Sequence, residues 1–311
     1  KTDPVHTEEA GAALWRFAQN STSDLCQTPG LFDNYGIRTV YGIQTTSLAA
    51  YTQIDWAVTP QLHVLPGIRY NYDKKIANYN RTRYGGLETS DPALIALKNG
   101  VYSDQAFDTD ASADNWSGQL SLQYKVNSQF NAFATYSVSY KPVGVNVGGL
   151  PTADGEVLLD LARVKPEAVH HKEVGLKTIP AKNAILNLTV YQTDIKDYQT
   201  LVQTPEPGVN RGYLANAEKV RVQGVELDGH FRIAEILTVN AAAAYTDGKY
   251  IKFDNAPVPL EEVGGPEAFK DISGGRLPGI SKWAGSLGAE LTQNGNLLRL
   301  PGHFLIGADV Y

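Results

Sequence analysis

The stretch QFNAFATYSVSY, residues 129–140, alternates apolar or aromatic side chains with mostly polar ones. That period of two is the signature of a β-strand with two different faces. Residues 47–58 and 119–126 repeat the pattern. Such strands are about twice the modal length of about 5–6 residues in soluble sheets, and a transmembrane strand needs roughly 9–11 tilted residues. Because every backbone group must be paired inside a bilayer, the pattern predicts part of a closed β-barrel wall.

Ten strands of this kind can be placed along the chain, joined by alternately short and long connections. The predicted strands cover residues 44–58, 61–73, 115–126, 129–141, 170–179, 184–197, 212–231, 236–250, 280–292 and 298–311. The long connections lie near residues 74–114, 142–169, 198–211 and 251–279. Bacterial barrels have short periplasmic turns and long extracellular loops. We therefore expect an extracellular loop region at residues 1–43, followed by barrel wall over residues 44–311.

Composition fits this all-β, antiparallel reading. The mean hydropathy of -0.26 is compatible with a barrel, whose strands carry polar lumen residues at alternate positions. A net charge of -6 leaves no basic face for nucleic acid. Cys26 is the only cysteine, so it is a buried or free thiol or has a partner outside this sequence. About ten strands would leave two unpaired edges in lipid, so we expect a fragment of a larger barrel.

Five stretches carry a family resemblance. NAEKVRVQGVELDG (residues 216–229) is similar to the segment N-A-G-K-A-x-x-x-G-x-E-x-E, with Glu218 in place of the usual Gly. LPGISKW (277–283) resembles L-P-x-x-P-K, and GIRYNYDK (67–74) resembles G-x-R-Y-x-x-D-x-K. Residues 165–177 and 188–198 resemble the strands that precede the first of these. In this order and spacing, the chain resembles the barrel of TonB-dependent outer-membrane receptors.

The resemblance implies a barrel of twenty-two strands, of which this chain lacks the N-terminal plug and the last strands. It also implies residence in the outer membrane of a Gram-negative bacterium. A scarce nutrient, with a ferric siderophore first, would bind extracellular loops and plug. The proton gradient of the inner membrane would then drive uptake through TonB, ExbB and ExbD, which act on a plug segment outside this chain. The resemblance implies no cofactor and no enzymatic activity.

Aromatic and cationic residues in the connection near 74–114 are the candidate ligand contacts, because they can stack on flat ligands and pair with carboxylate or catecholate oxygens. These are Tyr79, Arg81, Arg83, Tyr84 and Tyr102. A solvated loop is the alternative for each. The residues that carry the family motifs are interpreted as wall positions: Arg69, Asn216, Gly224, Glu226, Pro278 and Lys282.

Two details of the wall follow from the pattern. The apolar register changes between Val220 and Val225, which predicts a β-bulge at Gly224. With that bulge, Arg221, Glu226 and Asp228 would face the lumen or pair across strands. Arg69 would also point inward, because the apolar residues Ile68 and Tyr70 on either side of it belong to the outer face.

Other candidate sites are weaker. The acidic residues Asp104, Asp108, Asp110 and Asp114 lack the Gly and Glu of an EF-hand loop, which favours a solvated acidic segment. His170 and His171 are adjacent on a strand, so they point to opposite faces and cannot grip one metal ion together. Helical spacing in residues 92–99, 156–163 and, more weakly, 266–271 predicts short helices over the rim of the barrel.

Two other classes of protein remain open from the sequence. A barrel enzyme would need His paired with Asp or Ser at the rim or lipid face; His63 lies near a predicted periplasmic turn, and no Ser-His-Asp or Glu-His set converges by strand position. A passive porin or adhesion scaffold would have a smaller barrel without a plug.

Overall fold

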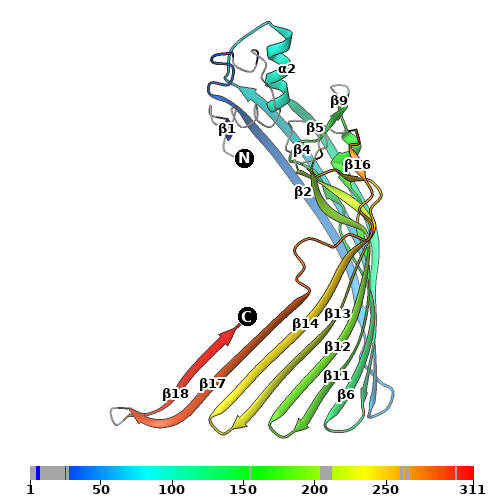
Figure 1. Ribbon diagram of the computed structural model, residues 1–311. Helices are drawn as coiled ribbons and strands as arrows, with labels where there is room; N and C mark the ends of the chain where they lie inside the picture. Colours follow the sequence, from blue (N-terminus) through cyan, green and yellow to red (C-terminus); the bar gives the residue numbers. More distant parts are fainter. Residues whose placement is uncertain are drawn as a thin grey trace.

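A single large antiparallel sheet dominates the structure, a computed structural model that describes residues 5–7, 25, 28–153, 156–203, 212–259, 262, 266–297 and 300–311. Its hydrogen-bonded order is β1-β2-β4-β5-β6-β11-β12-β13-β14-β17-β18, with β3 paired to β4. Consecutive long strands are therefore neighbours, as in an up-and-down barrel. The sheet curves strongly but does not close, and β1 and β18 form its two edges among the described strands (Figure 1).

Nine long strands and one shorter final strand make up the wall. They are β2 (Tyr35–Gln53), β4 (Leu62–Tyr84), β5 (Gln105–Lys125), β6 (Phe130–Lys141), β11 (Glu167–Ala181), β12 (Ala184–Gln203), β13 (Gly212–Ala234), β14 (Leu237–Lys252), β17 (Trp283–Leu297) and β18 (Leu300–Val310). The short strands are β1 (Val5–Thr7), β3 (Trp56–Ala57), β7 (Gly144–Val145), β8 (Thr152–Ala153), β9 (Glu156–Val157), β10 (Arg163–Val164), β15 (Ala256–Pro257) and β16 (Phe269–Lys270). All ten predicted strands are present, and the fold is the predicted all-β, antiparallel wall.

Several strands extend further toward the long connections than the sequence predicts. β2 begins inside the region expected to be loop before residue 44, and β4 and β5 reduce the connection expected at 74–114 to residues 85–104. In β5, buried Phe107 and Thr109 alternate with exposed Asp108 and Asp110. Beyond the membrane the outer face of such a strand meets water and its inner face meets loops, so the outward side chains are charged. A segment rich in these charged residues resembles a loop in composition, although the alternation of a strand is present in the sequence.

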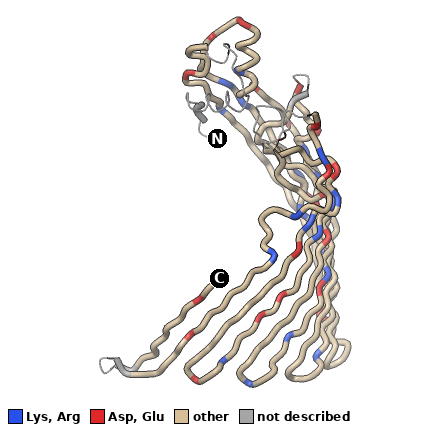
Figure 2. The backbone as a smooth tube through the Cα atoms, in the orientation of Figure 1, with Lys and Arg blue, Asp and Glu red and all other residues tan. Residues whose placement is uncertain are grey.

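The two faces of the wall differ as a membrane barrel requires. Large apolar side chains are exposed on the outer face, among them Leu120, Leu122, Val174, Val190, Val225 and Leu227. Aromatic pairs flank this surface, with ring centroids 5.0 Å apart in Tyr70–Trp116 and 4.9 Å apart in Tyr245–Trp283. Such aromatic residues mark the membrane interface. Charged residues gather where the strands meet the long connections (Figure 2).

The predicted short helices have mixed outcomes. α2 (Pro92–Val101) is confirmed, with Asp91 as N-cap accepting from the amide of Ala93 and Pro92 at its start. Of residues 156–163, only η2 (Leu159–Ala162) is helical, and β9 takes up the beginning. The helix expected at 266–271 is wrong, since Phe269–Lys270 pairs as β16 with β15. No described helix is both long and apolar enough to cross a membrane.

The predicted β-bulge at Gly224 is also wrong. β13 pairs with β12 without a shift from Ala184↔Phe231 to Lys196↔Lys219, and the shifts against β14 lie at Lys219/Val220 and Arg232/Ala234. The apolar residues change face for another reason: Val220 is buried in an inner cluster formed with the long connections, whereas Val225 is exposed on the outer face. Arg221 therefore lies on the outer face and not with Glu226 and Asp228 on the inner one.

Gly224 is needed for a close side-chain approach. A Cβ there would lie 2.4 Å from the carbonyl oxygen of Tyr245 and 2.8 Å from the hydroxyl of Tyr191. The Tyr191 hydroxyl lies 3.2 Å from Thr246 Oγ1 on β14, so its ring crosses β13 above Gly224.

We expect Gly224→Ala to destabilise the folded barrel by about 1–3 kcal/mol, because the new methyl group overlaps backbone as well as side chain. Gly302→Ala in β18 is the matched control, since nothing lies within 4 Å of a Cβ at that position. The measurement is the thermal unfolding midpoint of the full-length protein, read from heat-modifiable migration in gels. Equal midpoints for the two variants would contradict this role of Gly224.

A second prediction tests which face meets lipid. Val190→Arg places a charge on the outer face and should cost about 2–4 kcal/mol near the bilayer midplane. Thr189→Arg, one residue away on the inner face, should cost much less. Urea unfolding of the full-length protein in lipid bilayers measures both, and a larger cost for Thr189→Arg would reverse the assignment of the faces.

Candidate functional site

The upper end of β4 carries three of the candidate ligand contacts on the inner face. Tyr79, Arg81 and Arg83 alternate with exposed Asn78, Asn80 and Thr82. Tyr79 is buried and stacks on Phe107 of β5 at 5.0 Å. Arg81 is buried as well, and its guanidinium donates to the carbonyl and hydroxyl oxygens of Ser103 at 2.9 and 3.2 Å.

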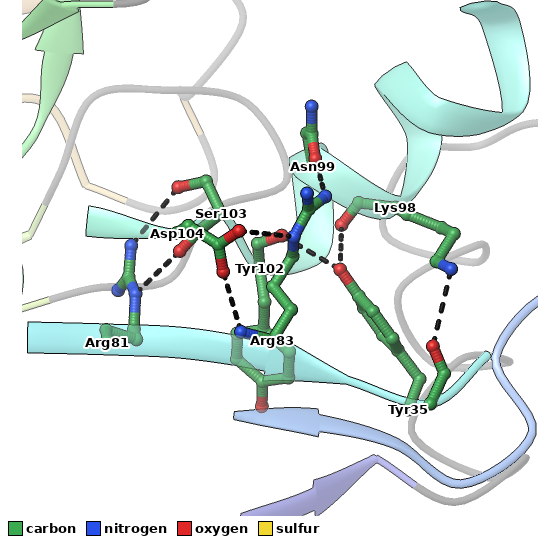
Figure 3. Close-up of polar contacts among 9 residues, drawn as sticks. Tyr35, Arg81, Arg83, Lys98, Asn99, Tyr102, Ser103 and Asp104 are labelled. Carbon is green, nitrogen blue, oxygen red and sulfur yellow. Dashed lines mark hydrogen bonds and ion pairs between the residues drawn. The ribbon is translucent and has the colours of Figure 1, made fainter. Parts of the chain in front are cut away.

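Helix α2 is fixed to the top of β2 and β4 by Tyr35 (Figure 3). Tyr35 is 1 % exposed and packs with Leu31, Phe32 and Leu94. Its hydroxyl lies 2.9 Å from the carbonyl oxygens of both Lys98 and Tyr102, at the end of the helix. Tyr102 contributes its ring as well, 6.0 Å from that of Tyr35. The helix C-terminus is thus satisfied by a buried phenol.

Two cations lie at the last turn of this helix, Lys98 within the turn and Arg83 on β4 beside it. The Arg83 guanidinium bonds Asn99 and forms an ion pair with Asp104, with Nε 3.4 Å from Oδ2 (Figure 3). The Lys98 ammonium donates to the carbonyl of Leu87 at 2.8 Å and lies 5.1 Å from the centre of the Tyr35 ring. Burial, with Arg83 nearby, lowers the pKa of Lys98, and burial raises the pKa of Tyr35.

A cavity of about 450 Å³ opens beside these cations. Its lining combines aromatic, cationic and acidic side chains with backbone: Tyr35, Arg83, Tyr84, Gly85, Leu87, Glu88, Thr89, Ile95, Lys98 and Asp104. Aromatic faces and cations together suit a flat ligand with anionic oxygens.

The connection between β6 and β11, residues 142–166, folds against the inner wall. Gln105 of β5 is buried and bonds the backbone of Leu150 in both directions, from Nε2 to the carbonyl at 2.9 Å and from the Leu150 amide to Oε1 at 2.8 Å. Gly149 has φ +94°, and a Cβ there would meet Arg81 at 2.7 Å and Tyr79 at 3.2 Å. Tyr79 and Arg81 are therefore covered by this connection.

The same connection is held at its other side by β12 and β13. Asn146 donates to the carbonyls of Leu161 and Leu214 at 2.6 and 2.9 Å, and it accepts from the Leu214 amide. Asn216 accepts from the Lys165 amide at 3.0 Å and donates to the carbonyls of Lys165 and Asp197. Asp197 has a positive φ of 51°, and it is the one position at which the otherwise continuous pairing of β12 with β13 is interrupted. Asn216 thus links Asp197 of β12 to Lys165, just before the start of β11.

The connection between β14 and β17 packs onto the wall in a similar way. Leu277 is buried in the inner cluster, and its amide donates to the carbonyl of Gly248 at 3.0 Å. Pro278 and Lys282 are exposed, and the Lys282 carbonyl accepts from the Thr246 amide at 2.9 Å. A Cβ on Gly248 would lie 2.6 Å from Ile280, so this glycine makes room for the segment.

The remaining wall residues keep ordinary structural roles. Arg69 donates to Asn71 at 2.6 Å and lies 5.5 Å from the centre of the Tyr51 ring. Glu226 is opposite Thr189 and Ala244.

The described residues contain no group of three or more acidic, His or Cys side chains that could hold a metal ion. His170 lies 2.9 Å from the Tyr136 hydroxyl, whereas His171 lies 2.8 Å from Thr193 Oγ1. Asp108, Asp110 and Asp114 point outward along β5, and Asp104 pairs with Arg83. Cys26 lies outside the described residues.

Comparison with known sequences decides the family. The family model described as "TonB dependent receptor-like, beta-barrel" matches residues 5–311. The chain belongs to the TonB-dependent receptor family. The receptor is 29% identical over 188 residues to the pesticin receptors of Yersinia enterocolitica and Yersinia pestis, an alignment that covers 60% of the chain but only 24% of each relative. The chain thus spans about a quarter of the length of these relatives.

Solved structures agree with this fold. The ferric yersiniabactin uptake receptor FyuA from Yersinia pestis superposes with a TM-score of 0.57 at 19% identity, covering 85% of this chain and 33% of that one. The siderophore receptor PiuA from Acinetobacter baumannii has a TM-score of 0.54 at 16% identity and covers 86% of this chain and 36% of that one. Family membership places the receptor in the Gram-negative outer membrane and among receptors, not enzymes.

The structure brings together only part of the predicted ligand set. Arg83 and Tyr84 line the cavity under α2, and Tyr102 borders it through the Tyr35 contact. Tyr79 and Arg81 lie beneath the connection 142–166, where Tyr79 packs with Leu150 and Ala162. Sequence reasoning missed Tyr35, Lys98 and Gln105. Lys98 could have been found from its place in the last turn of the predicted helix, but Tyr35 and Gln105 lie at strand ends that composition alone did not reveal.

We expect Gln105→Leu to release the connection 142–166 locally, because it leaves the amide and carbonyl of Leu150 without their partner at a cost of about 1–3 kcal/mol for each buried group. Hydrogen exchange of the Leu150 amide should become faster. Gln119→Leu, on the same strand and face but exposed, is the control. Unchanged exchange in Gln105→Leu would show that other contacts hold the connection.

Proposed function

We propose that the receptor imports a ferric siderophore across the outer membrane, driven by the inner-membrane proton gradient through TonB, ExbB and ExbD. This chain would contribute wall and extracellular mouth, and a plug segment outside it would contact TonB. The observation that carries the proposal is the cavity under α2, where Arg83 and Lys98 lie beside Tyr35 and Tyr84. Support also comes from the names of two proteins of similar structure, a ferric yersiniabactin uptake receptor and a siderophore receptor.

The chemistry of the cavity favours a ligand with anionic oxygen donors and a flat aromatic or carboxylate-bearing part. Arginine offers a planar fork of donors for such oxygens. The ring of Tyr84 lines the same cavity and provides an apolar face beside it. Glu88 and Asp104 line the same cavity and would disfavour a ligand whose negative charge is not matched by a cation. In this proposal Arg83 and Lys98 are ligand contacts, whereas Tyr79, Arg81 and Tyr102 position the connections.

The test is uptake of radioactive iron by cells that produce the full-length gene product and no other siderophore receptor, with a panel of ferric siderophores. We expect uptake of at least one of them, and its loss in cells without TonB. Arg83→Ala should weaken uptake about tenfold or more, as the loss of a charged hydrogen bond of about 1.5–3 kcal/mol implies.

Two further variants make the test specific. Arg38→Ala removes an exposed arginine from β2 at the same end of the sheet and should leave uptake unchanged. Asp104→Asn weakens the hold on Arg83 without removing its charge, so uptake should persist if Arg83 acts on the ligand. No uptake of any ferric siderophore by a folded receptor, or uptake that continues without TonB, would contradict the proposal.

A further inference from the structure

The sheet divides between β5 and β6 at its extracellular end. β5 pairs with β6 no further up than Gly118↔Val138, whereas β4 accompanies β5 to its upper end at Gln105. β4 and β5 rise together to α2 (Figure 1), and β6 continues along β11 instead. Among the described strands, residues 105–117 of β5 therefore have a neighbour on one side only. At about 3.3 Å per residue, this open edge is about 40 Å long.

The direction of the backbone hydrogen bonds alternates along β5 and identifies the groups at the open edge. The amide of Lys125 donates to the carbonyl of Gln61 beside β4 at 2.8 Å, so odd-numbered residues bond β4. The amide of Val126 donates to the carbonyl of Phe130 at 3.0 Å, so even-numbered residues point toward β6. In the described part of the chain, the even-numbered amides and carbonyls from 106 to 114 have no backbone partner on that side.

One side chain already bonds the open edge. Arg163, in the connection between β6 and β11, donates from Nε to the carbonyl oxygen of Asp110 at 2.7 Å. Its Nη2 lies 3.4 Å from the carboxylate of the same residue. Both side chains are more than half exposed, so the contact can be exchanged for another. Arg163 thus combines the two contacts that a basic strand would make here, a donor to the backbone and a positive charge beside the aspartate.

Acidic side chains follow the open edge on its outer face. Asp108, Asp110 and Asp114 are all exposed. Asp110 pairs with Arg163, but the ion pairs of the described residues include neither Asp108 nor Asp114. Lys74, on the outer face of β4 at the same height, offsets only part of this charge. Side chains directly opposite one another on paired strands attract when their charges differ and repel when they are alike. The edge therefore favours a strand that carries Lys or Arg.

The same charge decides among the possible occupants. A second copy of the receptor would bring the same acidic strand, whose aspartates would lie opposite those of the first copy. Charged edge strands are a common means by which proteins avoid pairing with their own copies. Lipid tails do not reach the edge, because it rises toward α2 from the girdle residue Trp116. A basic strand of a different protein meets both conditions.

We propose that the open edge of β5 is a docking site for an extended, basic segment of another protein, which adds to the sheet as a strand outside the cell. The even-numbered backbone groups of residues 106–114 would bond the added strand, and its lysines or arginines would lie opposite Asp108 and Asp114. Affinity would come from main-chain bonds and selectivity from the alternate side chains, as in other cases of strand addition. The site is separate from the cavity under α2 and does not depend on which nutrient is imported.

The test uses the full-length receptor in detergent and a labelled synthetic peptide as long as the open edge, in which Lys alternates with Val and Thr. Fluorescence anisotropy measures its binding, and a peptide with Glu in place of every Lys is the comparison. We expect the Lys peptide to bind and the Glu peptide not to bind. Asp108→Asn with Asp114→Asn should weaken binding of the Lys peptide about fivefold to tenfold, the usual effect of two cross-strand charge pairs.

A second pair of variants separates strand addition from charge attraction. Ser112→Pro removes an amide that points to the open edge and leaves the bonds to β4 in place, because proline is tolerated where a strand's N–H faces outward. It should weaken binding of the Lys peptide about tenfold or more. Ser112→Ala keeps the amide at the same exposed position and should bind the peptide as the unaltered receptor does. Heat-modifiable migration in gels shows that both variants are folded.

Equal binding by the Ser112→Pro and Ser112→Ala variants overturns strand addition, and equal binding of the Lys and Glu peptides overturns the basic partner. If the proline variant does not fold, a Lys peptide methylated at alternate backbone nitrogens takes its place, and unchanged affinity for that peptide is equally contrary. Slow hydrogen exchange of the even-numbered amides from 106 to 114 in the free receptor also overturns the proposal, since another part of the chain or a second copy would then cover the edge.

Discussion

The pairing of backbone amides and carbonyls in lipid is the constraint on which this structure depends. A strand that crosses a bilayer has no water to bond, so each of its polar backbone groups needs a neighbouring strand. The ladder from β2 to β18 meets that need without an inserted element, and each long strand bonds the strands next to it in the sheet order. Side chains are then free to differ between faces. The outer face can be apolar and the inner face polar because neither is required to hold the strands together.

Beyond the bilayer the same ladder serves a different purpose. β4, β5 and β13 continue past the aromatic girdle and present buried polar residues to the long connections. Arg81 and Gln105 are 2 % and 4 % exposed, yet each is bonded to backbone. Buried polar groups of this kind stabilise a specific arrangement only when their partners are in place. The mouth of the receptor is therefore built by docking loops onto strand extensions and not by loops that stand alone.

The sequence predicts the wall well and the mouth poorly, for a physical reason. In the membrane region one face must be apolar, so the period-two alternation of residues 129–140 is enough to predict a strand. Above the membrane Asp108, Asp110 and Asp114 meet water on one side, while Phe107 and Ala111 meet a loop on the other. The alternation is present in the sequence, but the residues that carry it are of the kinds that are common in turns. The error at Gly224 has the same origin, since Val220 is apolar to pack under a loop and not to meet lipid. Tyr35 and Gln105 could not be found because their partners, Lys98, Tyr102 and Leu150, are distant in sequence.

The way in which the connection 142–166 is docked has a consequence for how such a receptor can change its specificity. Gln105, Asn146 and Asn216 bond main-chain groups of Leu150, Leu161, Leu214 and Lys165 and none of their side chains. A main-chain group is the same whichever residue carries it. Side chains of the connection that do not pack on the wall can therefore be exchanged during evolution while its path stays fixed. Recognition of a new compound would then require substitutions in the loop alone, with no compensating change in the strands that support it.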